Sequence, residues 1–401
     1  MFKRILLLFT QIISVVSISW LHFSDIHVDI NYKLNAPSKC LIGTKLGTKC
    51  CSSLSFPISN TQKCQKFGDM YNDSPMDLVS GIFNWSATNL KNIDLIINTG
   101  DSGSHKDVSQ FFTNSNKNSM DFVSNELNKY FPTIPSLNVI GNHDSYPTVD
   151  QTFPGYKLFL SHVTKPWLKW INDNNMSQYG YYTYKYNSYT FVVLNNLYYD
   201  TENLFGINNT NRDRSLTNSQ FVWLDNVLST NDNIILIYHI PFMGGEANEY
   251  FNKNIKEIYT KYNQKILLTL NGHSHTDHFL LFTEINSSDY FSFSLVNPSV
   301  VPDNHFPMFR VYTIDEKSNN IDYIQYYCDL DISNKLDNLQ CFQQYKFSSL
   351  YNISSISLNN MILLYEKMHT SAITYNDFIE NYAYPTIDKN FNYYNEIINY
   401  I

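Results

Sequence analysis

The stretch KILLTLNGHSH, residues 265–275, joins a short apolar run directly to a glycine and two histidines. The run 265–270 has the length of a buried strand, and the polar, Gly-containing residues that follow end it. Runs of the same kind, each followed by polar residues, occur earlier in the chain, at residues 20–23, 93–98, 138–140, 190–194 and 234–238. The pattern predicts a sheet whose strands end in polar side chains.

Helix-like patterns lie between several of these runs, at residues 75–90, 120–130, 219–228 and 247–262. Strands that alternate with helices indicate an α/β layered domain. Residues 181–195 alternate aromatic and β-branched side chains, which is typical of antiparallel pairing. We therefore expect mixed rather than purely parallel strand pairing.

The C-terminal part of the chain differs from the rest. After a strand-like segment at residues 321–327, apolar residues recur at helical spacing, as at Met361, Leu364, Tyr365 and Met368. Because no Pro- or Gly-rich linker separates this tail, we expect it to pack on the main domain as a helical subdomain.

The composition limits the kinds of partner. The chain has 401 residues, 43% of them hydrophobic, which is enough for one large domain or two modest ones. Its formal net charge is -8, whereas proteins that bind duplex nucleic acid usually present a basic face. A nucleic-acid duplex is therefore excluded as an expected partner. A small phosphorylated ligand is still compatible, because metal ions can supply positive charge locally.

The N-terminus resembles a secretory signal. Lys3 and Arg4 precede a largely apolar run over residues 5–16, and the small residues Ser17 and Ser19 follow. The alternative is a membrane anchor, but the run is shorter than the roughly 20 residues that a spanning helix needs. We expect cleavage near residues 17–19 and no transmembrane segment.

Cysteines and glycosylation sequons fit an exported chain. An even number of cysteines in such a chain favours disulfides, and the spacing does not match paired CxxC zinc knuckles. The six are Cys40, Cys50, Cys51, Cys64, Cys328 and Cys341. Usable Asn-x-Ser/Thr sequons begin at Asn84, Asn175, Asn208, Asn286 and Asn352. A sixth, at Asn72, is weakened by Pro75 directly after its serine.

Five polar clusters follow the predicted strands. They are Asp25-Ile26-His27, Gly100-Asp101, Gly141-Asn142-His143-Asp144, His239, and Gly272-His273-Ser274-His275. As candidate ligands they offer two carboxylates, one amide oxygen and four imidazoles, with His143 and Asp144 remaining. This set is too large for one tetrahedral metal, but it suits two adjacent ions that share a bridging carboxylate.

The spacing within the clusters has a physical interpretation. In an extended chain, residues two apart project to the same side, so Asp25 and His27 would face one pocket, as would the two histidines of the last cluster. Glycines beside the ligands allow sharp turns and close backbone approach. Each cluster alone is more often an ordinary turn or loop. All five together, at predicted strand ends, indicate a metal centre.

The clusters resemble the calcineurin-like metallophosphoesterase pattern, and more closely that of the acid sphingomyelinase-like phosphodiesterases. The likeness covers residues 20–327 and rests on HFSDIHVD (22–29), TGD (99–101) with His105, GNHDSYP (141–147), HIP (239–241), GHSHTD (272–277), NPSV (297–300) and FRVY (309–312). It implies a four-layer α/β sandwich of two mixed β-sheets flanked by helices. The implied organisation is a signal peptide over residues 1–18, a catalytic domain over 19–327 and a small helical subdomain over 328–401.

The resemblance also implies roles for individual residues. Asp25, His27, Asp101 and His275 would hold the first metal, and Asp101, Asn142, His239 and His273 the second. Two zinc ions are the expected occupants, although other divalent ions are possible, and an imidazole-rich ligand set agrees with zinc. His143 would protonate the leaving group, Asp144 would orient that imidazole, and His105 would contact the substrate phosphate. Ser104 stands where purple ferric–zinc relatives carry a tyrosine, so a ferric site is not expected.

One departure from the pattern affects the disulfides. Related chains read Cys-Asp-Ser-Pro where this chain has NDSP at residues 72–75. We therefore expect Cys64 to replace the missing cysteine as the partner of Cys51. Cys40–Cys50 and Cys328–Cys341 would be the other bridges.

The expected activity is hydrolysis of phosphodiester or phosphoanhydride bonds by a metal-activated water. Sphingomyelinases place a saposin-like lipid-extracting domain before the catalytic domain, and we expect none here, because the expected signal segment ends a few residues before Asp25. Soluble substrates such as nucleotides are therefore preferred over a phospholipid head group. The alternatives are a sphingomyelin phosphodiesterase and a non-catalytic exported binding glycoprotein. We expect a monomer, either secreted or in an endolysosomal lumen.

Overall fold

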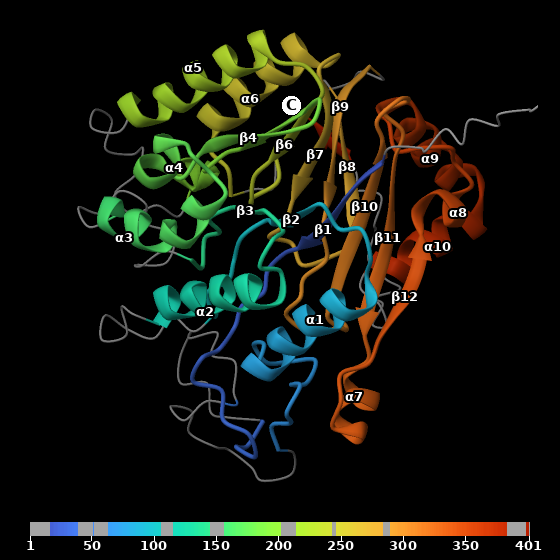
Figure 1. Cartoon of the computed structure of the whole chain (residues 1–401). Coiled ribbons are helices and arrows are strands. Elements are labelled where there is room, and N and C mark those ends of the chain that lie inside the picture. Colours follow the sequence, from blue (N-terminus) through green and yellow to red (C-terminus); the bar gives the residue numbers. More distant parts are fainter. Residues whose placement is uncertain are drawn as a thin grey trace, which may run out of the picture.

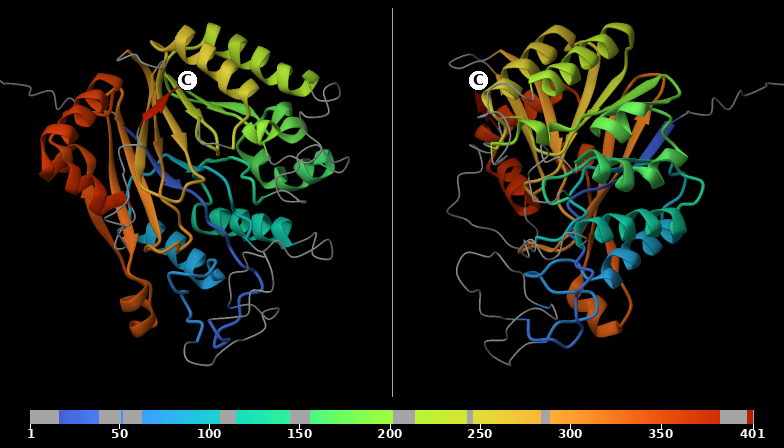
Figure 2. Two further views of the ribbon diagram at one scale, coloured as in Figure 1. Left: turned by 180° about the vertical axis from the view of Figure 1, so that it is seen from behind. Right: turned by 90° about the vertical axis from the view of Figure 1, so that its left-hand side faces the viewer.

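A computed structural model describes residues 17–38, 51, 63–105, 115–144, 156–201, 214–242, 246–283, 289–382 and 398–400. Two β-sheets lie face to face, and helices cover their outer faces (Figure 1). Helices α1 (Met76–Asn89) and α2 (Ser115–Tyr130) lie on one side of the sandwich, and α5 (Arg214–Thr230) and α6 (Glu249–Tyr262) lie on the other (Figure 2). The expected four-layer sandwich with two mixed sheets is confirmed.

The first sheet has the strand order β12-β11-β10-β1-β2-β3. Its strands are β1 (Ser17–Phe23), β2 (Leu95–Asn98), β3 (Ser136–Asn138), β10 (Met308–Asp315), β11 (Ile321–Cys328) and β12 (Cys341–Lys346). The first three are mutually parallel, and the last three pair antiparallel. The carboxyl ends of β1, β2 and β3 therefore meet at one edge.

The second sheet has the order β13-β8-β9-β7-β6-β5-β4. Its strands are β4 (Tyr182–Tyr186), β5 (Tyr189–Val193), β6 (Ile234–Ile237), β7 (Ile266–Asn271), β8 (His278–Thr283), β9 (Tyr290–Val296) and β13 (Ile398–Tyr400). Strands β5, β6, β7 and β9 are parallel. Strand β4 pairs antiparallel with β5, and β8 pairs antiparallel with β9 but parallel with β13. The antiparallel pairing expected within residues 181–195 is the β4–β5 hairpin.

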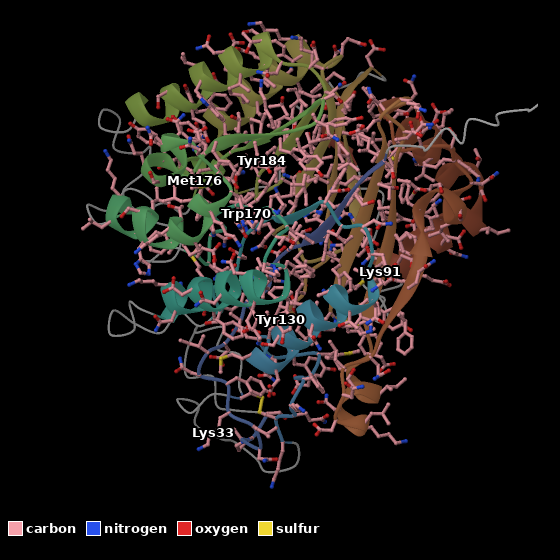
Figure 3. All side chains as sticks on the ribbon, viewed as in Figure 1. Lys33, Lys91, Tyr130, Trp170, Met176 and Tyr184 are labelled. Carbon is pink, nitrogen blue, oxygen red and sulfur yellow. A yellow bond between two sulfur atoms is a disulfide. The ribbon has the colours of Figure 1, made fainter. Side chains whose placement is uncertain are left out.

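The central strands are apolar because both of their faces are covered. On β1, Trp20 packs in the larger core cluster between the two sheets, while Leu21 and Phe23 pack in a second cluster beneath α1 and α2. Successive residues of a strand point to opposite faces, so a strand buried on both sides reads as a continuous apolar run. Side chains fill the space between the layers throughout (Figure 3).

The C-terminal region is helical, as expected, but it also extends the first sheet. Short helices α7 (Leu330–Leu336) and α8 (Phe347–Tyr351) flank β12, and α9 (Leu358–Thr370) and α10 (Ala372–Tyr382) follow. Met361, Leu364 and Met368 are buried, and Tyr365 is half-buried. Because β12 pairs with β11, a division of the chain at residue 327 would separate two neighbouring strands; that division stays a prediction.

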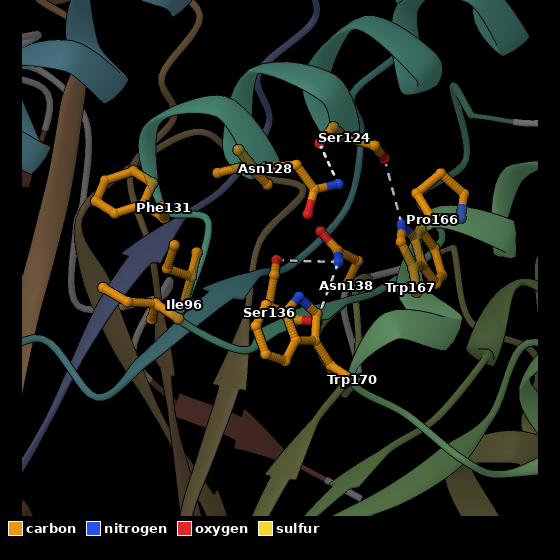
Figure 4. A pocket seen from close by; sticks show the side chains of 11 residues that line it. Ile96, Ser124, Asn128, Phe131, Ser136, Asn138, Pro166, Trp167 and Trp170 are labelled. Carbon is orange, nitrogen blue, oxygen red and sulfur yellow. Dashed lines mark hydrogen bonds between the residues drawn. The ribbon is translucent and has the colours of Figure 1, made fainter.

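Smaller helices complete the fold between the third and fourth strands. They are α3 (Tyr156–Val163), the 3-10 helix η1 (Lys165–Lys169) and α4 (Asn174–Tyr179), and a second 3-10 turn, η2 (Asn196–Tyr199), follows β5. A small pocket of about 10 Å³ lies between α2, β3 and η1 (Figure 4). A cavity needs roughly 10–15 Å³ of such space to hold one water, so this pocket holds a single water at most.

Two of the three expected disulfides are confirmed, Cys51–Cys64 and Cys328–Cys341. The third, Cys40–Cys50, lies outside the described residues, as do most of the expected signal peptide and the sequons at Asn208 and Asn286. Asn84 and Asn352 are exposed, whereas Asn72 is buried and donates two hydrogen bonds to Asp69. Among the helices that the structure describes, none is both long and apolar enough to cross a membrane.

Candidate metal centre

The five polar clusters lie at the carboxyl ends of β1, β2, β3, β6 and β7, as the sequence predicts. The first three strands belong to one sheet and the last two to the other. In α/β folds this end of a parallel sheet is where ligands usually bind. The structure brings all seven expected ligand residues together at this place, as the distances below show.

Asp101 lies at the centre of the cluster. Its Oδ2 atom is 3.4 Å from His27 Nε2 and 3.3 Å from His239 Nε2. Its Oδ1 atom accepts a hydrogen bond of 2.8 Å from the backbone N–H of His143. One carboxylate oxygen is therefore held by the backbone, and the other lies between imidazoles that come from different sheets.

The remaining ligands form two groups around Asp101. In the first group, His275 Nε2 lies 3.1 Å from His27 Nε2 and 3.6 Å from Asp25 Oδ1. In the second group, Asn142 Oδ1 lies 2.8 Å from His239 Nε2 and 3.1 Å from His273 Nδ1. Two sets of potential ligands thus share Asp101, in the arrangement that two adjacent ions require.

The outer nitrogen of each imidazole donates a hydrogen bond away from the centre. His27 Nδ1 bonds the carbonyl of Gly103 at 2.7 Å, and His239 Nδ1 bonds that of Thr99 at 2.8 Å. The two histidines of the last cluster bond carboxylates instead: His275 Nδ1 bonds Asp303 at 3.0 Å, and His273 Nε2 bonds Glu246 at 3.0 Å. In a neutral imidazole the second nitrogen then carries a lone pair, which faces the centre.

These inward lone pairs fit a bound cation. His27 and His275 turn lone pairs toward each other at 3.1 Å, and His239 turns one toward the amide oxygen of Asn142. Two acceptors at such distances repel each other unless positive charge lies between them. Burial would lower the pKa of His239, but the Asp101 carboxylate outweighs it and raises that pKa to about 10, so that without a metal ion a proton takes the inward position on this ring. The site thus favours positive charge, and its donor set suits metal ions.

Five of the ligand residues have a left-handed backbone, which the sequence did not predict. The φ angles are 48° at Asp25, 41° at His27, 56° at Asp101, 76° at His273 and 63° at His275. The expected reason for Asp25 and His27 to face one pocket, an extended chain, is therefore wrong. Each such residue costs about 1–2 kcal/mol. Backbone hydrogen bonds such as His27 N–H to the Asp101 carbonyl, at 2.9 Å, hold the conformation.

Two glycines allow the loops to approach each other. Gly100 has a φ of 106°, which side-chain-bearing residues rarely adopt. A Cβ atom at Gly141 would overlap the carboxylate of Asp101. These positions confirm the expectation that glycines beside the ligands permit sharp turns and close contact.

Asp144 binds the loop that carries Asp101. Its Oδ1 accepts the backbone N–H groups of Ser102 and Gly103, and its Oδ2 accepts those of Asp101 and Gly141, at 2.7–3.0 Å. Burial and the charge of Asp101 raise the pKa of Asp144 to about 7. These contacts assign Asp144 to loop positioning, and its expected effect on His143 stays a prediction.

His143 and His105 lie beside the ligands. The ring of His105 stacks on His27 at a centroid distance of 3.6 Å, and the ring of His143 is 4.8 Å from that of His105. Among the described residues, the groups that could hold a metal include His105 with His27 and His275, but not His143. Their expected roles as phosphate contact and general acid are compatible with this placement and stay predictions.

Three carboxylates near the site were missed by sequence reasoning. Asp73 accepts hydrogen bonds from His105 twice, from Nδ1 at 2.7 Å and from the backbone N–H at 3.0 Å. Asp303 and Glu246 bind ligand histidines, as described above. Each lies on a loop remote in sequence from its partner, and no motif marks it. The only sequence signal is that Asp73 belongs to the NDSP segment (72–75), which matches the family pattern except at Asn72.

The fold and the site together define an α/β sandwich with a cluster of Asp, Asn and His side chains suited to metal binding at its strand ends. The chain belongs to the calcineurin-like phosphoesterase family, whose model matches residues 18–277.

Proteins similar to this chain are named as phosphodiesterases. The chain is 26% identical to "Sphingomyelin phosphodiesterase A" of Dictyostelium discoideum over 90% of this chain and 62% of that protein. It is 26% identical to "Sphingomyelin phosphodiesterase B" of the same organism, over 90% of this chain and 58% of that protein. It is 24% identical to human "Cyclic GMP-AMP phosphodiesterase SMPDL3A" over 90% of this chain and 81% of that protein. The chain therefore spans about three fifths of the length of the first two relatives.

Proposed function

We propose that this protein is a secreted phosphodiesterase that hydrolyses soluble phosphodiesters or phosphoanhydrides, nucleotides among them, with two divalent metal ions. The observation that carries the proposal is the position of Asp101 Oδ2 between His27 and His239, 3.4 and 3.3 Å away, with a further set of ligands on either side. Family membership and the names of the relatives support the same chemistry.

The proposed ligand sets follow the two groups of atoms. Asp25, His27, Asp101 and His275 hold the first ion, while Asp101, Asn142, His239 and His273 hold the second. Imidazole-rich sites suit zinc. When bound, two such ions lower the pKa of a water molecule and neutralise charge on the phosphoryl group.

The other polar residues act on the substrate or on the loops. His143 protonates the leaving oxygen, and His105 binds a phosphate oxygen, with Asp73 holding the His105 ring. Asp144 keeps Asp101 in place through four backbone N–H groups. Among these residues only His143 would change protonation state, because the attacking water would give up its proton to solvent when the ions lower its pKa.

The extracellular or endolysosomal location is also proposed. The N-terminal sequence, the Cys51–Cys64 and Cys328–Cys341 disulfides and the exposed sequons at Asn84 and Asn352 support it. Disulfides persist in oxidising compartments.

Replacing His143 with Ala tests the mechanism. We expect turnover of a nucleotide diester to fall about 10²- to 10⁴-fold, because its alkoxide leaving group needs a proton and general acid catalysis contributes a factor of that size. Metal content, measured by elemental analysis, should stay unchanged. His162→Ala, which removes a partly exposed histidine of α3, is the control. Wild-type turnover by His143→Ala would remove this residue from the mechanism.

The substrate is tested with a panel of ATP, nucleotide diesters, a cyclic dinucleotide and sphingomyelin, with and without a chelator. The human relative is named for a nucleotide substrate, and this chain covers 81% of it. Faster cleavage of the nucleotides, lost with chelator, supports the proposal. Sphingomyelin cleavage at a matching rate would favour the second candidate, to which the names of the Dictyostelium relatives point. A metal-loaded protein inert toward every compound would indicate a binding glycoprotein.

A further inference from the structure

Each proposed metal position has two imidazoles with different surroundings. In both positions one imidazole is fully buried and bonds a backbone carbonyl: His27 with Gly103 in the first, and His239 with Thr99 in the second. The other imidazole lies nearer to solvent and bonds a carboxylate: His275 with Asp303 in the first, and His273 with Glu246 in the second. Each proposed metal position thus has one histidine bonded to a backbone carbonyl and one bonded to a carboxylate.

We propose that Asp303 and Glu246 are positioning residues that set the metal affinity of the two positions separately. Asp303 acts on the first position through His275, and Glu246 acts on the second through His273. The inference rests on the proposed two-metal function and adds two residues that no ligand motif contains. A carboxylate that accepts the outer N–H of a ligand histidine fixes its tautomer and ring orientation and raises its basicity.

The rings of His275 and His273 need this support more than those of His27 and His239. The side chains of His275 and His273 are 10% and 16% exposed, whereas those of His27 and His239 are fully buried, so packing alone restrains them less. They also present opposite nitrogens to the centre, Nε2 from His275 and Nδ1 from His273. A partner on the outer nitrogen decides which nitrogen carries the proton and hence which one can bind metal.

The backbone that carries each carboxylate is hydrogen-bonded to another loop. The loop that carries Asp303 donates hydrogen bonds from Val300, Val301 and Ser299 to the carbonyls of Ser24, Asp25 and His275, at 2.9, 2.9 and 3.1 Å. The carbonyl of Glu246 accepts the N–H of Thr201 at 2.7 Å. These bonds restrain the backbone that carries each carboxylate, which favours preorganisation of the two histidines.

The test measures metal binding rather than catalysis. Protein stripped by a chelator is titrated with Zn²⁺ in competition with a chromogenic chelator, and ¹¹³Cd resonances of Cd²⁺-loaded protein distinguish the two positions. Asp303→Asn should weaken one ion about 10- to 100-fold and shift one resonance, and Glu246→Gln should do the same to the other. Each amide can still accept the hydrogen bond, so these variants isolate the loss of charge. Asp303→Glu and Glu246→Asp should regain part of the affinity.

The control is Asp337→Asn, which removes an exposed carboxylate paired with Lys66 far along the chain from the ligands. Two ions bound by wild type and by every variant with equal affinity would overturn the inference and leave the proposed function standing. Fewer than two ions bound by wild type would overturn both. A wild type that binds two ions but cleaves no phosphodiester would refute only the proposed function, because the affinities of the variants still decide the roles of Asp303 and Glu246.

Discussion

At the scale of single residues, the placement of His105 depends on Asp73. The buried carboxylate of Asp73 accepts both the ring Nδ1–H and the backbone N–H of His105, so it fixes the side chain and the chain at once. Its neighbour Ser74 donates from its N–H to the carbonyl of His27 at 3.1 Å, which links this loop to a proposed ligand. Asp73 is therefore positioned to orient His105 without binding metal itself.

We expect Asp73→Asn to weaken the binding of inorganic phosphate, used as a probe of the proposed phosphate position, by about 10- to 100-fold. A hydrogen bond to a charged group contributes about 1.5–3 kcal/mol, and the new amide would turn an N–H toward a donor. The inhibition constant of phosphate and the metal content give the two readouts. The metal content should not change, and Asp121→Asn, which alters a more exposed Asp–His pair with His162, should change neither readout.

A double-mutant cycle tests whether Asp73 affects phosphate binding through His105. If Asp73 acts through His105, adding Asp73→Asn to His105→Ala should produce little further loss of phosphate affinity. Additive losses would show that Asp73 contributes by another route.

The sequence predicted the ligand residue types but not their surroundings. Asp101 and His273 could be recognised because each follows a glycine at the end of an apolar run. The left-handed backbone at these residues could not, because the same residues occur in many extended segments and only the packing of neighbouring loops selects the conformation. Asp303 and Glu246 could not be found either, since contacts between distant loops leave no periodic pattern in the sequence.

At the scale of secondary-structure elements, β3 is a three-residue strand at the edge of the first sheet. Its last residue, Asn138, uses its backbone N–H and carbonyl to bond the hydroxyl of Tyr182 on β4, at 2.8 and 2.9 Å. Tyr182 is fully buried, and its hydroxyl thus links the edge strands of the two sheets. The loop that carries the proposed ligand Asn142 begins two residues after Asn138.

Replacing Tyr182 with Phe should lower the free energy of unfolding by about 1–3 kcal/mol, because the buried N–H of Asn138 loses its partner. The loss is measured by urea denaturation in the presence of a chelator. Tyr184→Phe, on the same strand but half-buried, is the control. Equal midpoints for Tyr182→Phe and wild type would show that the hydroxyl contributes nothing to stability.

Strand prediction succeeded where both faces of the strand are buried. Residues 20–23 and 234–238 were predicted from continuous apolar runs, and the structure has β1 and β6 there. The third strand was expected at residues 138–140 and lies at Ser136–Asn138 instead. The polar residue Ser136 concealed the start of this strand, since its hydroxyl is satisfied only in the folded strand, where it accepts a hydrogen bond from the side chain of Asn138 at 3.1 Å.

At the scale of the whole molecule, buried neutral histidines make stability depend on pH. Burial lowers the pKa of His278 from its ordinary value of 6.5 to about 4, although a hydrogen bond to the Thr276 carbonyl acts in the opposite direction. Burial also lowers the pKa of His305 to about 4. Between pH 4 and pH 6.5 these two histidines bind protons in the unfolded chain but not in the folded protein. The stabilisation is therefore complete above pH 6.5 and is lost as the pH falls toward 4, at about 1.4 kcal/mol per pH unit for each group.

We expect His278→Gln to reduce the loss of stability between pH 7 and pH 5 by about 2 kcal/mol relative to wild type. Urea unfolding at both pH values, with chelator present so that metal release does not contribute, gives the comparison. His369→Gln, at an exposed position of α9, should retain the wild-type dependence. An unchanged dependence in His278→Gln would mean that this histidine is not held neutral in the fold.

The proposed ligands divide between the two sheets. Asp25, His27, Asp101 and Asn142 follow strands of the first sheet, and His239, His273 and His275 follow strands of the second. With ions bound, this end of the sandwich cannot separate without breaking coordination bonds. The rate at which the ions exchange with solvent would then report how often the two layers move apart, so that a slowly exchanging centre would also mark a rarely opening fold.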